Sequence, residues 1–184
     1  DWSSDVCSSD LKIKISLSAK SIKNAIKEMQ KYKNELRDKS EKFIDMLSDA
    51  GEKAMLEAIN ESPLGNTVSV RVEKQHTEYG CKAMLISAGE KHEVEGRDPF
   101  YTVLAIEFGS GIHYNKIPNP KANEMGYGVG TYPGQIHAFE DGWYYLGNDD
   151  KWHYTHGVRA TMPMYKAEME MMQKFNRIAK EAFK

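Results

Sequence analysis

Residues 18–61, the longest regular stretch of the chain, read SAKSIKNAIKEMQKYKNELRDKSEKFIDMLSDAGEKAMLEAINE. The apolar residues recur at steps of three, four or seven, a spacing that places them along one side of an α-helix. This apolar stripe consists of Ile22, Ile26, Met29, Leu36, Phe43, Leu47, Ala50, Ala54 and Ala58. The opposite side is rich in Lys, Glu and Asp, so the stretch predicts an amphipathic helix.

The length of this helix raises a question about its continuity. One unbroken helix would be roughly 65 Å long at about 1.5 Å per residue, which is too long for a compact domain. We therefore expect a break between Tyr32 and Ser40, where the stripe is weakest, and a flaw at Gly51. Ser62-Pro63 should end the helix, because the residue before proline avoids the helical region.

Short alternating runs on either side of the helix predict a small antiparallel sheet. Residues 12–17 alternate and indicate a short strand. Residues 67–73 and 82–88 indicate two more strands, and the polar stretch between them suits a hairpin connection. Residues 143–146 and 152–155 flank a polar Gly-Asn-Asp-Asp turn and predict a second hairpin.

Two further helices are predicted in the second half of the chain. Asp98 as N-cap and Pro99 at the first helical position would start a buried helix over 100–108, although a strand is also compatible with so short an apolar run. Residues 109–134 form a long loop rich in Gly, Pro and Asn. Thr161 should be the N-cap of the final helix.

The predicted fold class is α+β, with a long N-terminal helical segment and a C-terminal helix packed on a small antiparallel sheet.

The first eleven residues bear on the composition. Residues 1–11, DWSSDVCSSDL, match one reading frame of a common sequencing adapter, and we expect that they are not native. They hold three acids and no base, so 25 basic and 27 acidic residues become 25 and 24. A nearly neutral chain argues against a dedicated nucleic-acid binder. Without Cys7, Cys81 has no intrachain disulfide partner, which favours a reducing compartment.

Several residue groups resemble reactive or ligand-binding sites only weakly. The loop 126–130, GYGVG, is followed by no helix start, which a phosphate-binding loop requires. The histidines His113, His137, His153 and His156 lack the compact spacing of a zinc site. Cys81 carries no local signature of a nucleophile. We therefore predict no catalytic, cofactor-binding or metal-binding residues and no enzymatic activity.

The aromatic hairpin is more informative. Alternate residues of a strand share a face, so Trp143 and Tyr145 lie on one side and Tyr144 and Leu146 on the other. Aromatic residues and Met are enriched at protein interfaces. Ordinary packing within the chain explains the aromatic residues equally well, and both interpretations stay open at this point.

Two segments carry a resemblance to a known family. Tyr101, Ala105, Ile106, Glu107, Phe108 and Gly109 fit the pattern Tyr-x-x-x-(Val/Ile)-Glu-Phe-Gly. Gly157, Ala160, Pro163, Met164 and Ala167 fit a Gly-x-x-Ala-x-Pro-(Phe/Met)-(Met/Leu)-x-x-Ala helix start, with Tyr165 in place of the second apolar residue. With the aromatic hairpin between them, the chain resembles the gene-product-ten-like family of lambdoid long-tailed phages. Residues 62–67 depart from the Ala-Pro-x-Asp-Thr-Gly-x-Leu segment of many members, which puts any role of that loop in doubt.

The resemblance implies a structural function. It implies a minor tail, tail-completion or head–tail joining protein, with residues 12–184 as one tail-assembly domain forming a ring at the head-proximal end of the tail. It implies no catalytic residues, and we expect no cofactor; the expected partners are further copies of the chain and the neighbouring head-closure and tail-tube or terminator proteins. The expected location is the virion neck, with the host cytoplasm during assembly. We expect the assembly interface to include Phe108, Trp143, Tyr144, Arg159, Pro163, Met164 and Tyr165.

Two other functions are suggested by parts of the sequence. The segment 142–152 resembles one unit of the wall-binding repeats of Gram-positive surface proteins, which makes a carbohydrate-binding module the alternative. Such repeats occur in tandem, and only one copy is present here. A cysteine or metal hydrolase using Cys81 and the loop histidines is the third hypothesis.

Overall fold

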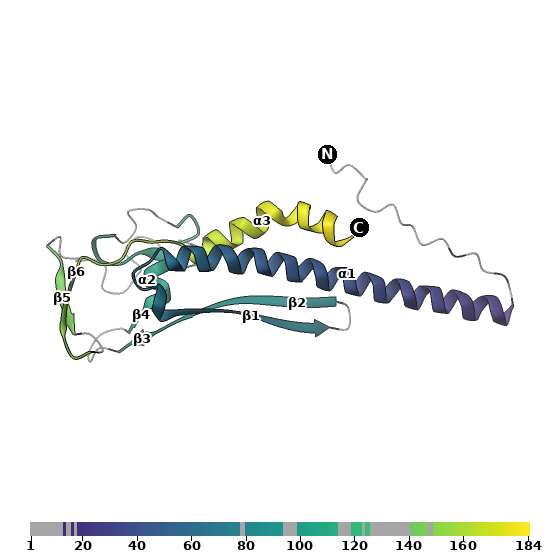
Figure 1. Ribbon diagram of the computed structural model, residues 1–184, viewed down its shortest axis with the longest axis horizontal. Coiled ribbons are helices and arrows are strands. Elements are labelled where there is room, and N and C mark those ends of the chain that lie inside the picture. Colours follow the sequence, from purple (N-terminus) through teal and green to yellow (C-terminus); the bar gives the residue numbers. More distant parts are fainter. Residues whose placement is uncertain are drawn as a thin grey trace.

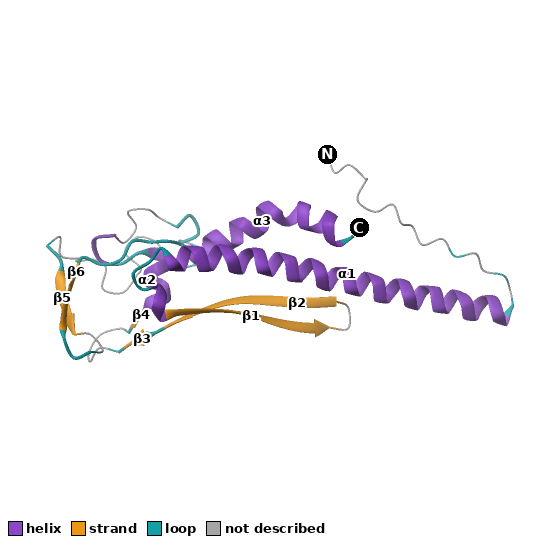
Figure 2. Ribbon diagram, viewed as in Figure 1, coloured by secondary structure: helices purple, strands orange, loops and turns teal. Residues whose placement is uncertain are grey.

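The computed structural model describes residues 13, 16, 18–77, 80–93, 99–113, 119–122, 124–125, 141–146 and 149–184. The molecule is elongated around helix α1 (Ala19–Asn60), which runs along most of its length (Figure 1). Helix α3 (Pro163–Ala182) packs on one side of α1, and the hairpin of β1 (Val68–Thr77) and β2 (Gly80–Gly89) packs on the other (Figure 2). The predicted α+β class is confirmed.

Helix α1 is one unbroken helix of 42 residues. The predicted break between Tyr32 and Ser40 is therefore wrong. That prediction assumed that a helix of about 63 Å must fit inside a compact domain. Instead, the N-terminal part of α1 extends past the rest of the molecule (Figure 1), so its length is not limited by packing. The start is capped by Ser18, whose Oγ accepts a hydrogen bond from the Ser21 amide at 3.3 Å.

The predicted flaw at Gly51 is also wrong. Gly51 is buried inside the continuous helix, where α3 and β2 come close. A Cβ atom at this position would lie 2.8 Å from Met171 Sδ and 3.2 Å from Leu85 Cδ2. The glycine therefore allows α3 and β2 to pack closely against α1, and it does not bend the helix.

The first hairpin is as predicted. Strands β1 and β2 pair antiparallel, with Val72 opposite Leu85. The helix ends at Asn60, just before Ser62-Pro63, and a short 3-10 turn, η1 (Gly65–Thr67), leads into β1. The core is centred on Met55, Ile59, Ala167 and the partly buried Val68, Val70 and Leu85. Most of the strand predicted over 12–17 lies outside the described residues.

The start of the middle helix differs from the prediction. Helix α2 (Thr102–Phe108) has Tyr101 at its N-cap position, and Asp98, the predicted N-cap, lies outside the described residues. The chain is still extended before α2, because β4 (Phe100–Tyr101) pairs with β3 (Lys91–His92). A short turn, η2 (Gly111–His113), follows α2.

The last third contains the predicted hairpin, β5 (Trp143–Leu146) and β6 (Trp152–Thr155), which lies at the end of the molecule opposite the start of α1 (Figure 1). Thr161 is not the N-cap of α3. The cap position is Met162, which adopts a left-handed conformation with φ 54°.

None of the helices in the described part of the chain is long and apolar enough to cross a membrane.

Candidate functional site

The two segments that carry the family resemblance meet at the first turn of α3. The side chain of Glu107, near the end of α2, is fully buried. Its carboxylate accepts hydrogen bonds from the backbone amides of Met164 at 2.8 Å and Tyr165 at 3.1 Å. The first amides of a helix have no partner within the helix. Glu107 therefore caps α3 from a position 57 residues earlier in the chain.

A local cap is missing at this helix start for a clear reason. Met162 occupies the cap position, and its thioether side chain makes no capping hydrogen bond. Pro163 follows at the first helical position, where its lack of an N–H group has no cost. The negative carboxylate of Glu107 at the positive end of the helix dipole completes the arrangement.

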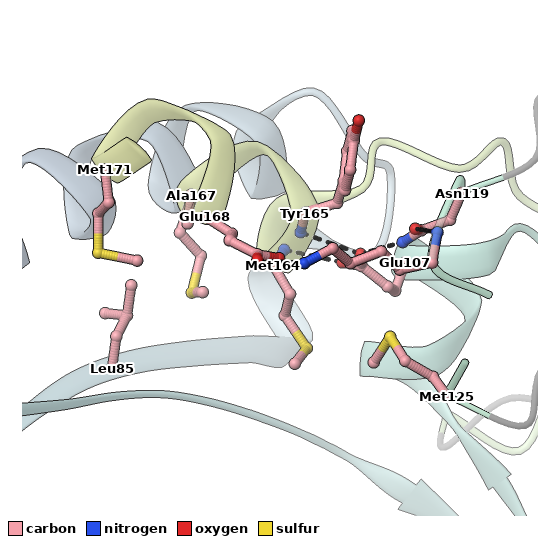
Figure 3. A pocket seen from close by; sticks show the side chains of 11 residues that line it. Leu85, Glu107, Asn119, Met125, Met164, Tyr165, Ala167, Glu168 and Met171 are labelled. Atoms are coloured by element: carbon pink, nitrogen blue, oxygen red, sulfur yellow. Dashed lines mark hydrogen bonds and ion pairs between the residues drawn. The ribbon is translucent and has the colours of Figure 1, made fainter. Parts of the chain in front are cut away.

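Part of the long loop is attached to the same carboxylate. Asn119 is buried, and its Nδ2 donates to Glu107 Oε1 at 2.6 Å. Its Oδ1 accepts a hydrogen bond from the Lys121 amide at 2.9 Å. Three separate segments, namely α2, residues 119–122 and α3, therefore share one buried acid (Figure 3).

Opposing influences act on the protonation of Glu107. Burial is the largest influence and raises the pKa of Glu107 above its ordinary value. The amides of Met164 and Tyr165 and the side chain of Asn119 act in the opposite direction, because they stabilise the charged form. The net direction is upward.

Backbone hydrogen bonds extend the contact between the two segments. The amide of Thr161 donates to Ile106 O at 2.9 Å, and the amide of Ser110 donates to Val158 O at 2.8 Å. In return, the amide of Val158 donates to Ser110 Oγ at 3.0 Å. The stretch before α3 is thus held along the end of α2 and the turn that follows it.

Two glycines make this close pairing possible. Gly109 and Gly157 both have positive φ, at 79° and 98°. A Cβ on Gly157 would lie 2.2 Å from Ser110 O, and a Cβ on Gly109 would lie 2.8 Å from His113 O. The glycines of both family patterns therefore have the same structural explanation: only glycine allows this backbone conformation and this distance.

An apolar cleft of about 230 Å³ lies beside the Glu107 cap (Figure 3). Its apolar lining is mainly methionine, from Met55, Met125, Met164 and Met171, together with Leu85. Lys121 and Glu168 form an ion pair at its edge. Methionine side chains adapt to irregular partners, so the cleft suits an inserted apolar group.

The second hairpin presents an aromatic face to solvent. Tyr144 pairs with Tyr154 across the strands, and Trp152 lies two residues before Tyr154 on the same strand, so these three side chains share one face. The exposed fractions of Tyr144 and Trp152 are 65% and 69%, and Tyr154 is exposed as well. The rings of Tyr144 and Tyr154 contact each other, with centroids 5.1 Å apart. We call Tyr144, Trp152 and Tyr154 the aromatic face.

The predicted interface residues differ in how far they are buried. Phe108 and Pro163 are buried inside the chain, so they cannot contact a partner directly; they were misassigned because their patterns are needed for packing within the fold. Tyr144, Arg159 and Met164 are exposed, and Tyr165 is half-buried. The backbone of Trp143 lies in β5, but its side chain is outside the described part.

Glu107 and Asn119 were missed, although an acid within an apolar run is a signal for a buried cap.

The cysteine and histidines that could serve in catalysis or metal binding do not come together among the described residues. Burial is the main cause that raises the pKa of the Cys81 thiol, followed by the nearby Glu41 and Asp45 carboxylates, which disfavours a thiolate nucleophile. His153 contacts Asp149 at 2.8 Å, and the ring of His156 contacts Tyr154. Across the described residues, no group of three or more His, Cys, Asp or Glu side chains could hold a metal ion. The loop 126–130 and His137 lie outside the described residues.

Comparisons of the chain with protein-family models, with curated proteins and with solved structures found no match.

Proposed function

We propose that the chain is a structural phage virion-assembly protein, a tail-completion or head–tail joining component that forms a ring at the head-proximal end of the tail. The observation that carries the proposal is the capping of α3 by Glu107. The Glu-Phe-Gly pattern supplies the acid, and the Ala-x-Pro pattern supplies the helix start that lacks its own cap. The co-occurrence of both patterns thus has a physical cause in one fold, which supports the resemblance to that family.

The exposed surfaces support a packing role. The aromatic face lies at one end of an elongated molecule, and the methionine-lined cleft lies beside the Glu107 cap. Aromatic and methionine side chains contribute large, adaptable contact area to protein interfaces. Exposed Arg159, on the segment before α3, and exposed Met164, in the first turn of α3, extend the proposed interface.

Native mass spectrometry of the chain, co-expressed with the products of its neighbouring genes, tests this proposal. We expect a complex with several copies of the chain bound to a head-closure or tail-terminator protein. Trp152→Ala should weaken the complex, because Trp152 lies on the aromatic face. Met172→Ala removes another exposed apolar side chain, on α3, and should leave the complex unchanged. A chain that stays outside every complex would reject the proposal.

The aromatic face also favours a second candidate function, carbohydrate binding. Exposed rings of Tyr and Trp offer flat apolar surfaces with polar edges, which suit the faces of sugar rings. A pull-down with host cell walls discriminates between the two functions. Retention that is lost in Trp152→Ala supports the carbohydrate-binding module, whereas no retention rejects it.

A further inference from the structure

The N-terminal part of α1 projects beyond the elements that cover the rest of the helix. Lys39 Nζ donates to Phe183 O at 3.2 Å, which places the end of α3 beside Lys39. His76 Nδ1 lies 3.2 Å from Glu41 Oε1, which places the tip of the first hairpin beside Glu41. Residues 19–38 of α1, about 30 Å of helix at 1.5 Å per residue, extend past both (Figure 1).

The apolar stripe continues along this projecting segment without a cover among the described residues. Ile22, Met29 and Leu36 are 46%, 57% and 44% exposed. The next residue of the same line, Phe43, is covered by α3, because its ring lies 5.3 Å from that of Phe175. The stripe therefore continues beyond the helix that covers its other end.

The spacing of the stripe specifies the kind of partner. Ile22, Met29, Leu36 and Phe43 recur every seven residues, and Tyr32 lies three residues after Met29. A straight helix has about 3.6 residues per turn, so a seven-residue repeat stays aligned only with a helix that supercoils around it. A second copy of the chain offers a matching stripe.

The charges beside the stripe favour a parallel arrangement. In a parallel coiled coil with Ile22, Met29 and Leu36 at the first core position, Glu28 of one copy faces Lys33 of the other. In an antiparallel arrangement, Glu28 faces residues at the same flanking position of the seven-residue repeat in the other copy, and these include Glu28 and Glu35. The parallel pairing is attractive, and the antiparallel pairing brings like charges together.

We propose that residues 19–38 of α1 form a parallel coiled coil with the same segment of a second copy. This surface is separate from the aromatic face, and the inference does not depend on the proposed virion role. Only three core layers of large apolar residues are available, so the association is expected to be weak and dependent on concentration.

Sedimentation velocity of the full chain across about 1–300 µM tests the proposal. Met29→Glu places a carboxylate in the core of the coiled coil and should weaken association by about 10- to 100-fold. Gln30→Glu, the neighbouring exposed residue, adds the same charge outside the core and should associate as the unmodified chain does. Circular dichroism checks that both variants keep their helix. A chain that is monomeric throughout, or equal behaviour of the two variants, would overturn the proposal.

Disulfide cross-linking tests the orientation. In a Cys7→Ser, Cys81→Ser background, Leu36→Cys should cross-link with itself, because parallel helices bring equal positions together. The opposite result is a cross-link that forms only when Leu36→Cys is mixed with Ile22→Cys. That result would show antiparallel helices and overturn the proposed arrangement. If Met29→Glu blocks association but the chain never joins virion complexes, the coiled coil stands and the virion role fails.

Discussion

The most consequential residue of the described structure is a buried acid that acts as a helix cap at long range. A carboxylate has enough acceptor sites for the amides of Met164 and Tyr165 and for Asn119 together. A carboxamide has one acceptor oxygen, and its NH2 group would face other donors. The requirement for an acid at position 107 thus follows from the number and direction of its donors.

Glu107→Gln should therefore lower the free energy of unfolding at neutral pH by about 2–4 kcal/mol, because buried donors lose their acceptor. Urea denaturation followed by circular dichroism measures the change. Glu168→Gln is the control, since Glu168 pairs with Lys121 at a partly exposed site and should change stability by less than about 1 kcal/mol. Equal stability of Glu107→Gln and the unmodified chain would show that the cap is unimportant.

The pKa of Glu107 predicts a pH dependence with a definite sign. A raised pKa means that the folded state binds the proton more tightly than the unfolded state does. The resulting stabilisation is fully present below the ordinary pKa of 4.5 and is lost as the pH rises through the folded-state pKa. The stability advantage of the unmodified chain over Glu107→Gln should therefore shrink as the pH rises above 4.5. An advantage that grows with pH would show that the hydrogen bonds outweigh burial.

Glycine at position 157 should be essential for a steric reason. In Gly157→Ala the new Cβ would lie 2.2 Å from Ser110 O, and the backbone keeps a φ of 98°. We expect a loss of about 2–4 kcal/mol from the contact and the strain together. Gly80→Ala also has a positive φ but no atom within 4 Å, so it isolates the strain and should cost less. Thermal unfolding of the two variants measures the difference, and equal losses would argue against the steric explanation.

At the scale of elements, the second hairpin contributes surface rather than stability. Trp152 is mostly exposed, so Trp152→Ala should change the free energy of unfolding by less than about 0.5 kcal/mol. Ile59→Ala, in the core beneath α3, should cost about 2–5 kcal/mol. Chemical denaturation of both variants checks the contrast. A large loss in Trp152→Ala would show that the aromatic face packs within the chain.

The sequence predicted those elements whose pattern is local. The alternating valines of β1 and the aromatic runs of β5 and β6 determine strands through side chains only two residues apart, and these strands are present. Helix α1 was also predicted, but its continuity was not, because compactness was assumed. The start of α2 was misplaced because Tyr101 pairs with β3, a contact absent from any local pattern.

The candidate site was predictable only in part for the same reason. Both family patterns were recognised, yet neither indicates on its own that Glu107 reaches the amide of Met164 across 57 residues. Phe108 and Pro163 were assigned to an interface because a pattern does not distinguish residues that pack inside the chain from those that face a partner. The exposure of Tyr144 required the structure as well.

At the scale of the whole molecule, the shape separates two apolar surfaces. The projecting segment of α1 lies at one end, and the aromatic face lies at the other (Figure 1). Helix α3 and the first hairpin cover the C-terminal half of α1, where the core lies. The coiled coil that we propose and the contacts that we propose for the aromatic face therefore use surfaces at opposite ends of the molecule.

The most direct test of this account is the position of the chain in assembled particles. Antibody or gold labelling of an epitope tag at the C-terminus, viewed by electron microscopy, locates it in virions that contain the tagged chain. The account predicts several labels per particle, all at the neck between head and tail. Particles without label, while the chain remains free in the lysate as a monomer, would contradict it.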